Sequence, residues 1–315
     1  MIITSNFDER KLSTIKGLLF FVIALITTSC QQSASSQTPS SALYETDVFK
    51  KYWFSGMAEI NSYDLQQSRY GETREGSAVL IFVTEDFSGN KHVKLDQPNG
   101  ADKIGVLKLN FTKNFVTGIY PYSLMLSTFT PIEAKPSPQT LKVTMSSQEW
   151  CGQVYAQLNF RNQKYQLVSH SYFEQEGDQQ TVYKPVVLED EIWNRIRLNP
   201  SALPQGEIEI LPGLFHSRLL HVPLSVQKAT ATLLAEKETN RYTLTFPALK
   251  RSLIIHFARK FPHRIIRWEE RFQERGKEVI TRATLLKSIR TDYWTKNKNE
   301  YLPLRDSLGL SRKNY

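Results

Sequence analysis

The sequence contains little of what fibrous, disordered or repeatedly membrane-spanning proteins require. Its 315 residues include only 14 glycines and 14 prolines, too few for a collagen-like or low-complexity chain. Only 23% of the residues are charged, and abundant Phe and Tyr argue against global disorder. The one long apolar run lies near the N-terminus, which excludes a protein that crosses a membrane several times. The length allows one large β domain or two ordinary domains.

The first 29 residues have the pattern of a secretory signal. Arg10, Lys11 and Lys16 precede nine consecutive apolar residues at 18–26. Nine residues are too few to span a bilayer, which takes about 20, but they suit the central part of a signal peptide. The Thr-Thr-Ser-Cys segment that follows resembles the bacterial lipobox. This resemblance implies cleavage before Cys30 and attachment of lipid to that cysteine.

An uncharged segment follows Cys30. Residues 31–41 consist of Gln, Ser, Ala, Thr and Pro, so we expect residues 30–42 to form a flexible tether. Neither an Asp directly after Cys30 nor an acidic cluster is present, which favours a lipid anchor on the periplasmic face of the outer membrane. The membrane is then the first partner, and nucleic acid is not expected as one. Cys151 is left as a lone thiol, so no internal disulfide is expected.

Alternation of apolar and polar residues dominates residues 43–315, which we interpret as a single β-rich domain. The pattern is clear at 154–160 and recurs at 141–145, 242–246 and 266–272. It is typical of strands with one buried face, and the short polar turns between them favour antiparallel neighbours. Large open sheets tend to curl. We therefore predict a mainly antiparallel α+β fold, a strongly curved sheet or half-barrel with one or two covering helices. A two-sheet sandwich is the alternative.

Two segments have the pattern of helices. Residues 47–53 can form one, with Thr46 as its N-cap. The other spans 188–198, with acidic residues at its start and arginines near its end. Residues 78–83 form a strand that is apolar on both faces, and we expect the second helix to cover its outer side. Four apolar residues share the packing face of this helix: Leu188, Ile192, Trp193 and Ile196.

These features together resemble known envelope proteins. A lipobox, a large antiparallel sheet and an inserted helix are similar to the half-barrel of lipoprotein-carrier and outer-membrane lipoprotein-receptor proteins. Residues 52–70, 144–154 and 264–275 also resemble an uncharacterised group of Bacteroidetes lipoproteins, some of which bear the name septum formation inhibitor. That name belongs to nucleotide pyrophosphatases with an N-terminal Ser-rich, Pro-Arg-Arg phosphate motif, which this sequence lacks. The group resemblance implies no known activity.

Candidate catalytic chemistry centres on Cys151. Residues 146–152 bring together two hydroxyls, an amide, a carboxylate, an indole and this thiol. A nucleophilic cysteine needs a nearby base, and His170 is a candidate if neighbouring strands bring it close. A lone cysteine among aromatics is more often a small packed residue, which is the alternative interpretation. No histidine pair has zinc-motif spacing, and no phosphate loop or catalytic elbow occurs, so no metal and no cofactor are predicted.

Positive charge is concentrated near the C-terminus. Residues 241–315 hold 18 Lys and Arg against seven Asp and Glu, whereas the whole chain holds 40 against 31. Such a block can attract anionic lipid head groups or an acidic envelope protein, through Arg267, Arg271, Arg275 and Lys277. The alternative is a solvated strand face on which these arginines pair with Glu269 and with neighbouring strands.

Aromatic residues crowd the middle third of the chain, where they either fill the core or line a cavity inside the curved sheet. Trp150, Tyr155 and Tyr172 are the candidate ligand-binding residues. The leading hypothesis is a lipid-anchored, non-enzymatic binding or carrier module for an apolar or amphipathic ligand. A Cys151-dependent hydrolase or transferase is the second hypothesis. An envelope scaffold that docks through its basic C-terminal face is the third.

Overall fold

The computed structural model describes residues 46–97, 99–133 and 139–310. The chain divides into two units, residues 1–39 and 40–315, and only the second is described. The predicted signal segment, Cys30 and the predicted tether lie outside the described residues. No helix in the described ranges is long and apolar enough to cross a membrane.

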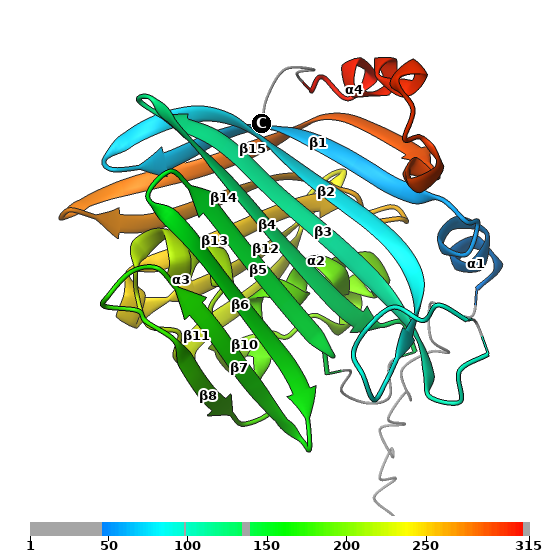
Figure 1. Cartoon of the computed structure of the whole chain (residues 1–315), viewed down its shortest axis with the longest axis horizontal. Helices are drawn as coiled ribbons and strands as arrows, with labels where there is room; N and C mark the ends of the chain where they lie inside the picture. Colours follow the sequence, from blue (N-terminus) through cyan, green and yellow to red (C-terminus); the bar gives the residue numbers. More distant parts are fainter. Residues whose placement is uncertain (1–45, 98, 134–138, 311–315) are drawn as a thin grey trace, which may run out of the picture. The chain divides into compact units, whose positions relative to one another are not determined.

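In the described part of the chain, fifteen strands form one curved sheet in the order β8-β7-β6-β5-β4-β3-β2-β1-β15-β14-β13-β12-β11-β10-β9 (Figure 1). The strands are β1 (Ala58–Arg69), β2 (Glu72–Ser88), β3 (Lys103–Thr117), β4 (Tyr120–Pro131), β5 (Lys142–Glu149), β6 (Gly152–Arg161), β7 (Lys164–Ser171), β8 (Gln179–Tyr183), β9 (Val187–Leu188), β10 (Gly206–Leu211), β11 (Gln227–Ala235), β12 (Thr239–Phe246), β13 (Arg251–Ala258), β14 (Ile265–Glu274) and β15 (Lys277–Thr291).

Neighbouring strands are antiparallel, except that β9 and β10 are parallel. Pairing of β1 with β15 joins the two halves of the chain. Within the described residues the edge strands β8 and β9 do not pair, so the sheet is open. The prediction of a mainly antiparallel, strongly curved sheet is therefore confirmed, and the sandwich alternative is wrong.

The predicted alternation places one side of each strand in the core. The buried residues include Val154, Ala156 and Leu158 in β6, and Tyr242, Leu244 and Phe246 in β12. Strand β14 departs from the pattern at its start, where Ile265 rather than Ile266 is buried. The pairing register between β13 and β14 shifts between His256 and Phe257, which accounts for the change of face.

The helices are α1 (Asp47–Trp53), α2 (Glu189–Leu198), α3 (Leu214–Leu220) and α4 (Pro303–Ser307), with single 3₁₀ turns at Pro200–Ala202, Pro247–Leu249, Tyr293–Thr295 and Asn299–Tyr301. Both predicted helices are present. Thr46 caps α1 as expected, because its Oγ1 accepts a hydrogen bond from the Phe49 amide at 3.2 Å.

Helix α2 lies inside the curve of the sheet, between the strands drawn in front and those drawn behind in Figure 1. Trp193 contacts Phe111 of β3 and Trp268 of β14, with ring centroids 5.2 and 5.3 Å apart. Ile192 and Ile196 are buried in the same core. The expectation that this helix covers the outer side of residues 78–83 is therefore wrong.

The C-terminal segment covers that outer side instead. Val79 and Val83 of β2 belong to a second apolar cluster with Leu308, which follows α4. Ser62 of β1 donates a hydrogen bond to the Leu308 carbonyl and fixes the segment there. Residues 293–310 contain only short helical turns, so no helical periodicity in the sequence identified them as the cover.

Candidate functional site

Charged side chains occupy the interior beside α2, and we call the first group the central ion cluster. Arg251 of β13 donates two hydrogen bonds to the Glu189 carboxylate, at 2.5 and 2.6 Å, and one to Glu270 at 2.7 Å. His216 Nδ1 lies 3.1 Å from the same Glu270 oxygen. The cluster comprises Lys113, Glu189, Asp190, His216, Arg251 and Glu270, each at most 9% exposed.

Burial and neighbouring charge compete in setting the pKa of each group. Burial, followed by the Glu189 charge, raises the pKa of Asp190 to about 8. Burial is the largest single influence on Glu270 and acts to raise its pKa, but the Arg251 charge, the contact with His216 and the Lys113 charge together hold that pKa well below its ordinary value. Burial lowers the pKa of the Lys113 amine. The space beside these groups is about 30 Å³, room for a water but not for a substrate.

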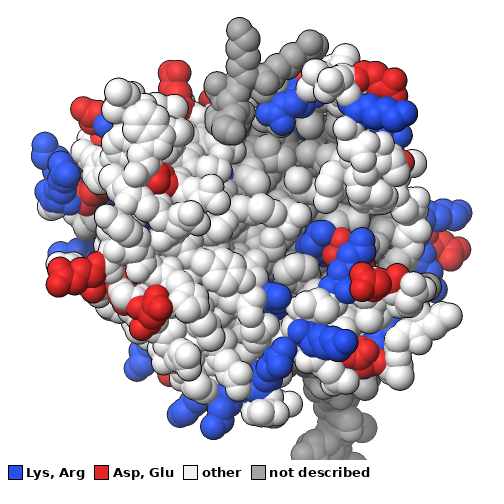
Figure 2. Space-filling view, viewed as in Figure 1, with Lys and Arg blue, Asp and Glu red and all other residues white. Residues whose placement is uncertain are grey.

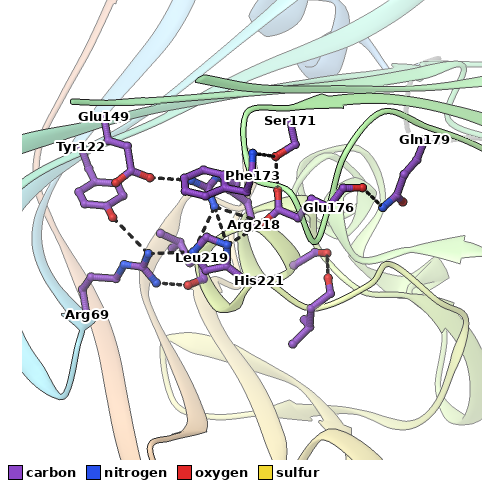
Figure 3. A network of polar contacts seen from close by, with 12 residues as sticks. Arg69, Tyr122, Glu149, Ser171, Phe173, Glu176, Gln179, Arg218, Leu219 and His221 are labelled. Carbon is purple, nitrogen blue, oxygen red and sulfur yellow. Dashed lines mark hydrogen bonds and ion pairs between the residues drawn. The ribbon is translucent and has the colours of Figure 1, made fainter. Parts of the chain in front are cut away.

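A second group, the rim network, lies where the inner faces of β4 and β5 meet α3 (Figure 3). Arg218 of α3 donates to Glu149 Oε1 at 2.6 Å, and both side chains are 2% exposed. Arg69 of β1 donates to the Tyr122 hydroxyl at 3.1 Å and to the Leu219 carbonyl. The network comprises Arg69, Tyr122, Glu149, Glu176, Arg218 and His221.

Glu176 joins the loop between β7 and β8 to this network. One of its oxygens lies 2.7 Å from His221 Nδ1 and 3.6 Å from Arg218 Nη1. Its other oxygen accepts a hydrogen bond from the Ser171 hydroxyl at 2.6 Å. His221 ends α3 with left-handed backbone, φ 54°, which turns its side chain toward the loop (Figure 3).

The rim network is held by burial as well as by charge. Burial raises the pKa of Tyr122, and its hydrogen bond with Glu149 raises it further, so this phenol stays protonated. The Phe173 ring lies 4.5 Å from the Arg218 guanidinium and adds a cation–π contact. Arg218 contacts both carboxylates of the network, Glu149 and Glu176, so the two carboxylates share one cationic neighbour.

A cavity of about 90 Å³ adjoins the rim network. Its polar side includes Glu176, Gln179, Ser217, Arg218 and His221. Its floor is apolar and is formed by inward residues of β5, β6 and β7 and by α3: Met145, Val154, Ala156, Leu167 and Leu214. The site can therefore accept an apolar group and a polar group side by side.

The two candidate catalytic residues are not brought together. Cys151 is exposed in the turn between β5 and β6. His170 stands opposite Tyr155 in the β6–β7 ladder and contacts Asp178 at 3.2 Å. Tyr155 is four residue steps along the chain from Cys151, a span of roughly 13 Å at about 3.3 Å per residue. His170 is therefore not placed to act as a base for this thiol.

The three candidate ligand-binding aromatics do not line the cavity. Tyr155 is 42% exposed and points to the outer face, because its neighbours on β6 face the core. Trp150 and Tyr172 lie at strand ends and are 69% and 72% exposed. The outer row that contains Tyr155 also carries Thr112, Met125, Ser146 and His170. Figure 2 shows a broad area without Lys, Arg, Asp or Glu on the side viewed in Figure 1, where β3 to β7 lie in front.

The basic block is partly neutralised on the outer face of β14 and β15. Arg267 and Arg271 lie 3.2 Å from Glu269, and Arg282 lies 3.6 Å from it. Arg275 and Lys277 belong to the turn between these strands and to the first residue of β15. Three arginines around one carboxylate leave an excess of positive charge, and Arg275 lies beyond the end of β14, off the strand face that carries Arg267 and Arg271.

Sequence reasoning missed the charges inside the fold, although a signal for some of them exists. Lys113 follows Phe111 at the inward spacing of β3, and Glu270 stands between Trp268 and Phe272 on the buried side of β14. A charge at a core position of an alternating strand indicates a buried ion pair. Arg218 has no comparable signal, since its partner Glu149 lies 69 residues away in the sequence.

Within the described ranges, no three His, Cys, Asp or Glu side chains are arranged to hold a metal ion. Comparisons of the chain with protein families, with characterised proteins and with solved structures give no match. Any argument about function therefore rests on the geometry of this chain.

Proposed function

We propose that this protein is a non-catalytic binding module for a small amphipathic ligand. The ligand places an apolar group in the cavity of about 90 Å³ and a polar group at Arg218 and His221. The observation that carries the proposal is the direct contact of an apolar floor with a polar rim in one cavity. Such a combination is typical of small-molecule sites, where apolar contacts supply affinity and a few polar groups fix orientation.

The volume of the cavity sets the size of the apolar group. An engineered protein cavity of about 150 Å³ binds benzene. A cavity of about 90 Å³ therefore takes a short alkyl or branched group, or the tip of a longer one. The core aromatics and α2 fill the rest of the inner face around Trp193, so the acyl chains of a whole lipid do not fit in this cavity.

The proposal includes the cellular location that the sequence favours. A lipid on Cys30 would hold the domain at the periplasmic face of the outer membrane, and residues 30–42 would let it reach along that surface. The membrane would then be the constant partner of the domain. An anionic lipid or an envelope protein would be a second partner through the excess positive charge around Glu269.

Titration with straight-chain alcohols tests the binding function. Affinity should rise from butanol to longer alcohols by about 0.8 kcal/mol for each buried CH₂ group, and should stop rising when the cavity is full. The Ala156→Leu variant fills the floor and should lose at least tenfold in affinity. Val168→Leu on the neighbouring strand β7 adds volume at a half-buried position that does not line the cavity, and should bind like the parent protein.

Two results would contradict the binding function. One is no saturable binding of any alcohol by calorimetry or by thermal shift. The other is an Ala156→Leu protein that folds and still binds as tightly as the parent.

A further inference from the structure

The loop between β7 and β8 places a carboxylate at the polar side of the proposed binding cavity. Glu176 lies on this loop, and its side chain is 22% exposed. One oxygen contacts His221 and Arg218, and the other accepts the Ser171 hydroxyl. Figure 3 shows these partners converging on Glu176 from β7 and α3. The structure thus contains a position already fitted to a carboxylate group.

The two carboxylates of the rim network differ in how firmly they are held. Glu149 is 2% exposed and lies 2.6 Å from Arg218, within a charge-assisted hydrogen bond. Glu176 is on a loop, lies 3.6 Å from Arg218 and is about a fifth exposed. Removing Glu149 would leave the buried Arg218 with only its longer contact to Glu176, whereas Glu176 can move into solvent at little cost. Glu176 is therefore the replaceable carboxylate.

We propose that the ligand carries a carboxylate head group, and that this group takes the place of Glu176 against His221, Arg218 and Ser171. This inference rests on the proposed function, since it assumes that the apolar end of the ligand enters the cavity. Exchange of one carboxylate for another keeps the charge balance of the network. When the ligand binds, the loop at 172–178 leaves the rim network. Without ligand, Glu176 occupies the position that the ligand carboxylate would take, so the two carboxylates compete for it.

Paired titrations of octanoate and octanol test the inference. Glu176→Gln removes the competing charge but keeps an oxygen that can accept a hydrogen bond from Ser171. It should raise the affinity for octanoate at least fivefold and leave the affinity for octanol unchanged. Glu174→Gln is the matched control, because Glu174 is exposed on the same loop and forms no ion pair within the described residues. It should leave both affinities unchanged.

Hydrogen exchange supplies a second measurement on the unmodified protein. The amides of Glu176 and Gly177 donate to the Phe173 carbonyl, at 3.0 and 2.9 Å. Saturating octanoate should speed exchange of these amides as the loop leaves the rim, and octanol should not.

The outcomes separate this inference from the binding function. Octanol binding with no gain for octanoate in Glu176→Gln overturns the carboxylate inference and leaves the binding function standing. An equal gain in Glu174→Gln also overturns it, because a general charge effect would then explain the result. Failure of both octanol and octanoate to bind overturns the inference and the function together.

Discussion

Arg197 is a fully buried charged side chain, 0% exposed, and its contacts show how the interior accommodates ions. Its Nη2 donates to Glu59 at 2.8 Å and its Nε donates to the Pro262 carbonyl at 2.8 Å. Burial acts to raise the pKa of Glu59, but the Arg197 charge and hydrogen bond lower it to about 2. The pair therefore stabilises the fold above the ordinary pKa of 4.5 and loses this contribution as the pH falls toward 2.

Replacing Arg197 with Met should destabilise the domain by about 3–5 kcal/mol, because Glu59 would remain buried without its main partner. Adding Glu59→Gln to this variant should restore part of the loss, since no buried charge is then unpaired. Urea denaturation gives the free energies of unfolding. Arg282→Met is the control, because the Arg282 side chain is 50% exposed. A loss similar to that of the control would show that the pair contributes little.

The raised pKa of Asp190 predicts a dependence of stability on pH that is opposite in sign to that of Glu59. Its pKa is raised from 3.8 to about 8, so the folded state keeps a proton that the unfolded state has lost. Stability should fall as the pH rises between these values, by about 1.4 kcal/mol per pH unit for this group. Asp190→Asn should remove that part of the slope. An unchanged slope in denaturation series at several pH values would contradict the assignment.

At the level of secondary structure, α2 is unusual because it is buried on nearly all sides. Asn194 donates to the Leu107 carbonyl at 3.0 Å and to Thr130 Oγ1 at 3.0 Å, which ties the helix to β3 and β4. Its acidic first turn contributes Glu189 and Asp190 to the central ion cluster. The helix thus serves both as core and as the element that organises the interior charges.

The Trp193→Ala variant should lose about 3–5 kcal/mol of stability, because the Trp193 ring fills the space between Phe111 and Trp268. Trp294→Ala provides a control of the same chemistry, since Trp294 is 47% exposed. That variant should lose less than about 1 kcal/mol. Equal denaturation midpoints for the two variants would mean that α2 is not part of the stabilising core.

The whole molecule is proposed to be tethered by its N-terminal segment. Cys30→Ser should abolish lipid attachment and release the protein from membranes, which metabolic labelling with a tagged fatty acid measures directly. Cys151→Ser should keep the label, because Cys151 lies in an exposed turn of the folded domain. Labelling that persists in Cys30→Ser and disappears in Cys151→Ser would contradict the anchor.

The outer face of β14 and β15 gives a second prediction for the whole molecule. The unanchored Cys30→Ser protein should bind anionic vesicles more tightly than neutral ones, with about 1 kcal/mol gained for each cation near the surface. Glu269→Gln should strengthen this binding, because it removes the carboxylate shared by Arg267, Arg271 and Arg282. Salt should weaken the binding steeply. Equal co-sedimentation with both vesicle types would contradict this prediction and would favour the alternative, in which these arginines form a solvated face that binds no lipid.

Local patterns in the sequence identified five of the strands and two of the helices. Period-two alternation follows from the pleat of a single strand, and the cap of α1 follows from one threonine, so neither needs information from distant residues. The tendency of a large antiparallel sheet to curve also follows from the number and type of strands.

Only the tertiary structure decided where α2 packs, what covers β2 and which charges meet inside. Pairing of β1 with β15 joins segments more than 200 residues apart into one sheet. The curvature of that sheet creates an interior in which α2 and α3 pack. Glu149 was already visible beside Cys151 in the sequence, but its role depends on Arg218 and on the α3 backbone that positions it. A buried charge needs an opposite charge beside it. Long-range packing determines which segment supplies that opposite charge, so the sequence near the first residue does not identify it.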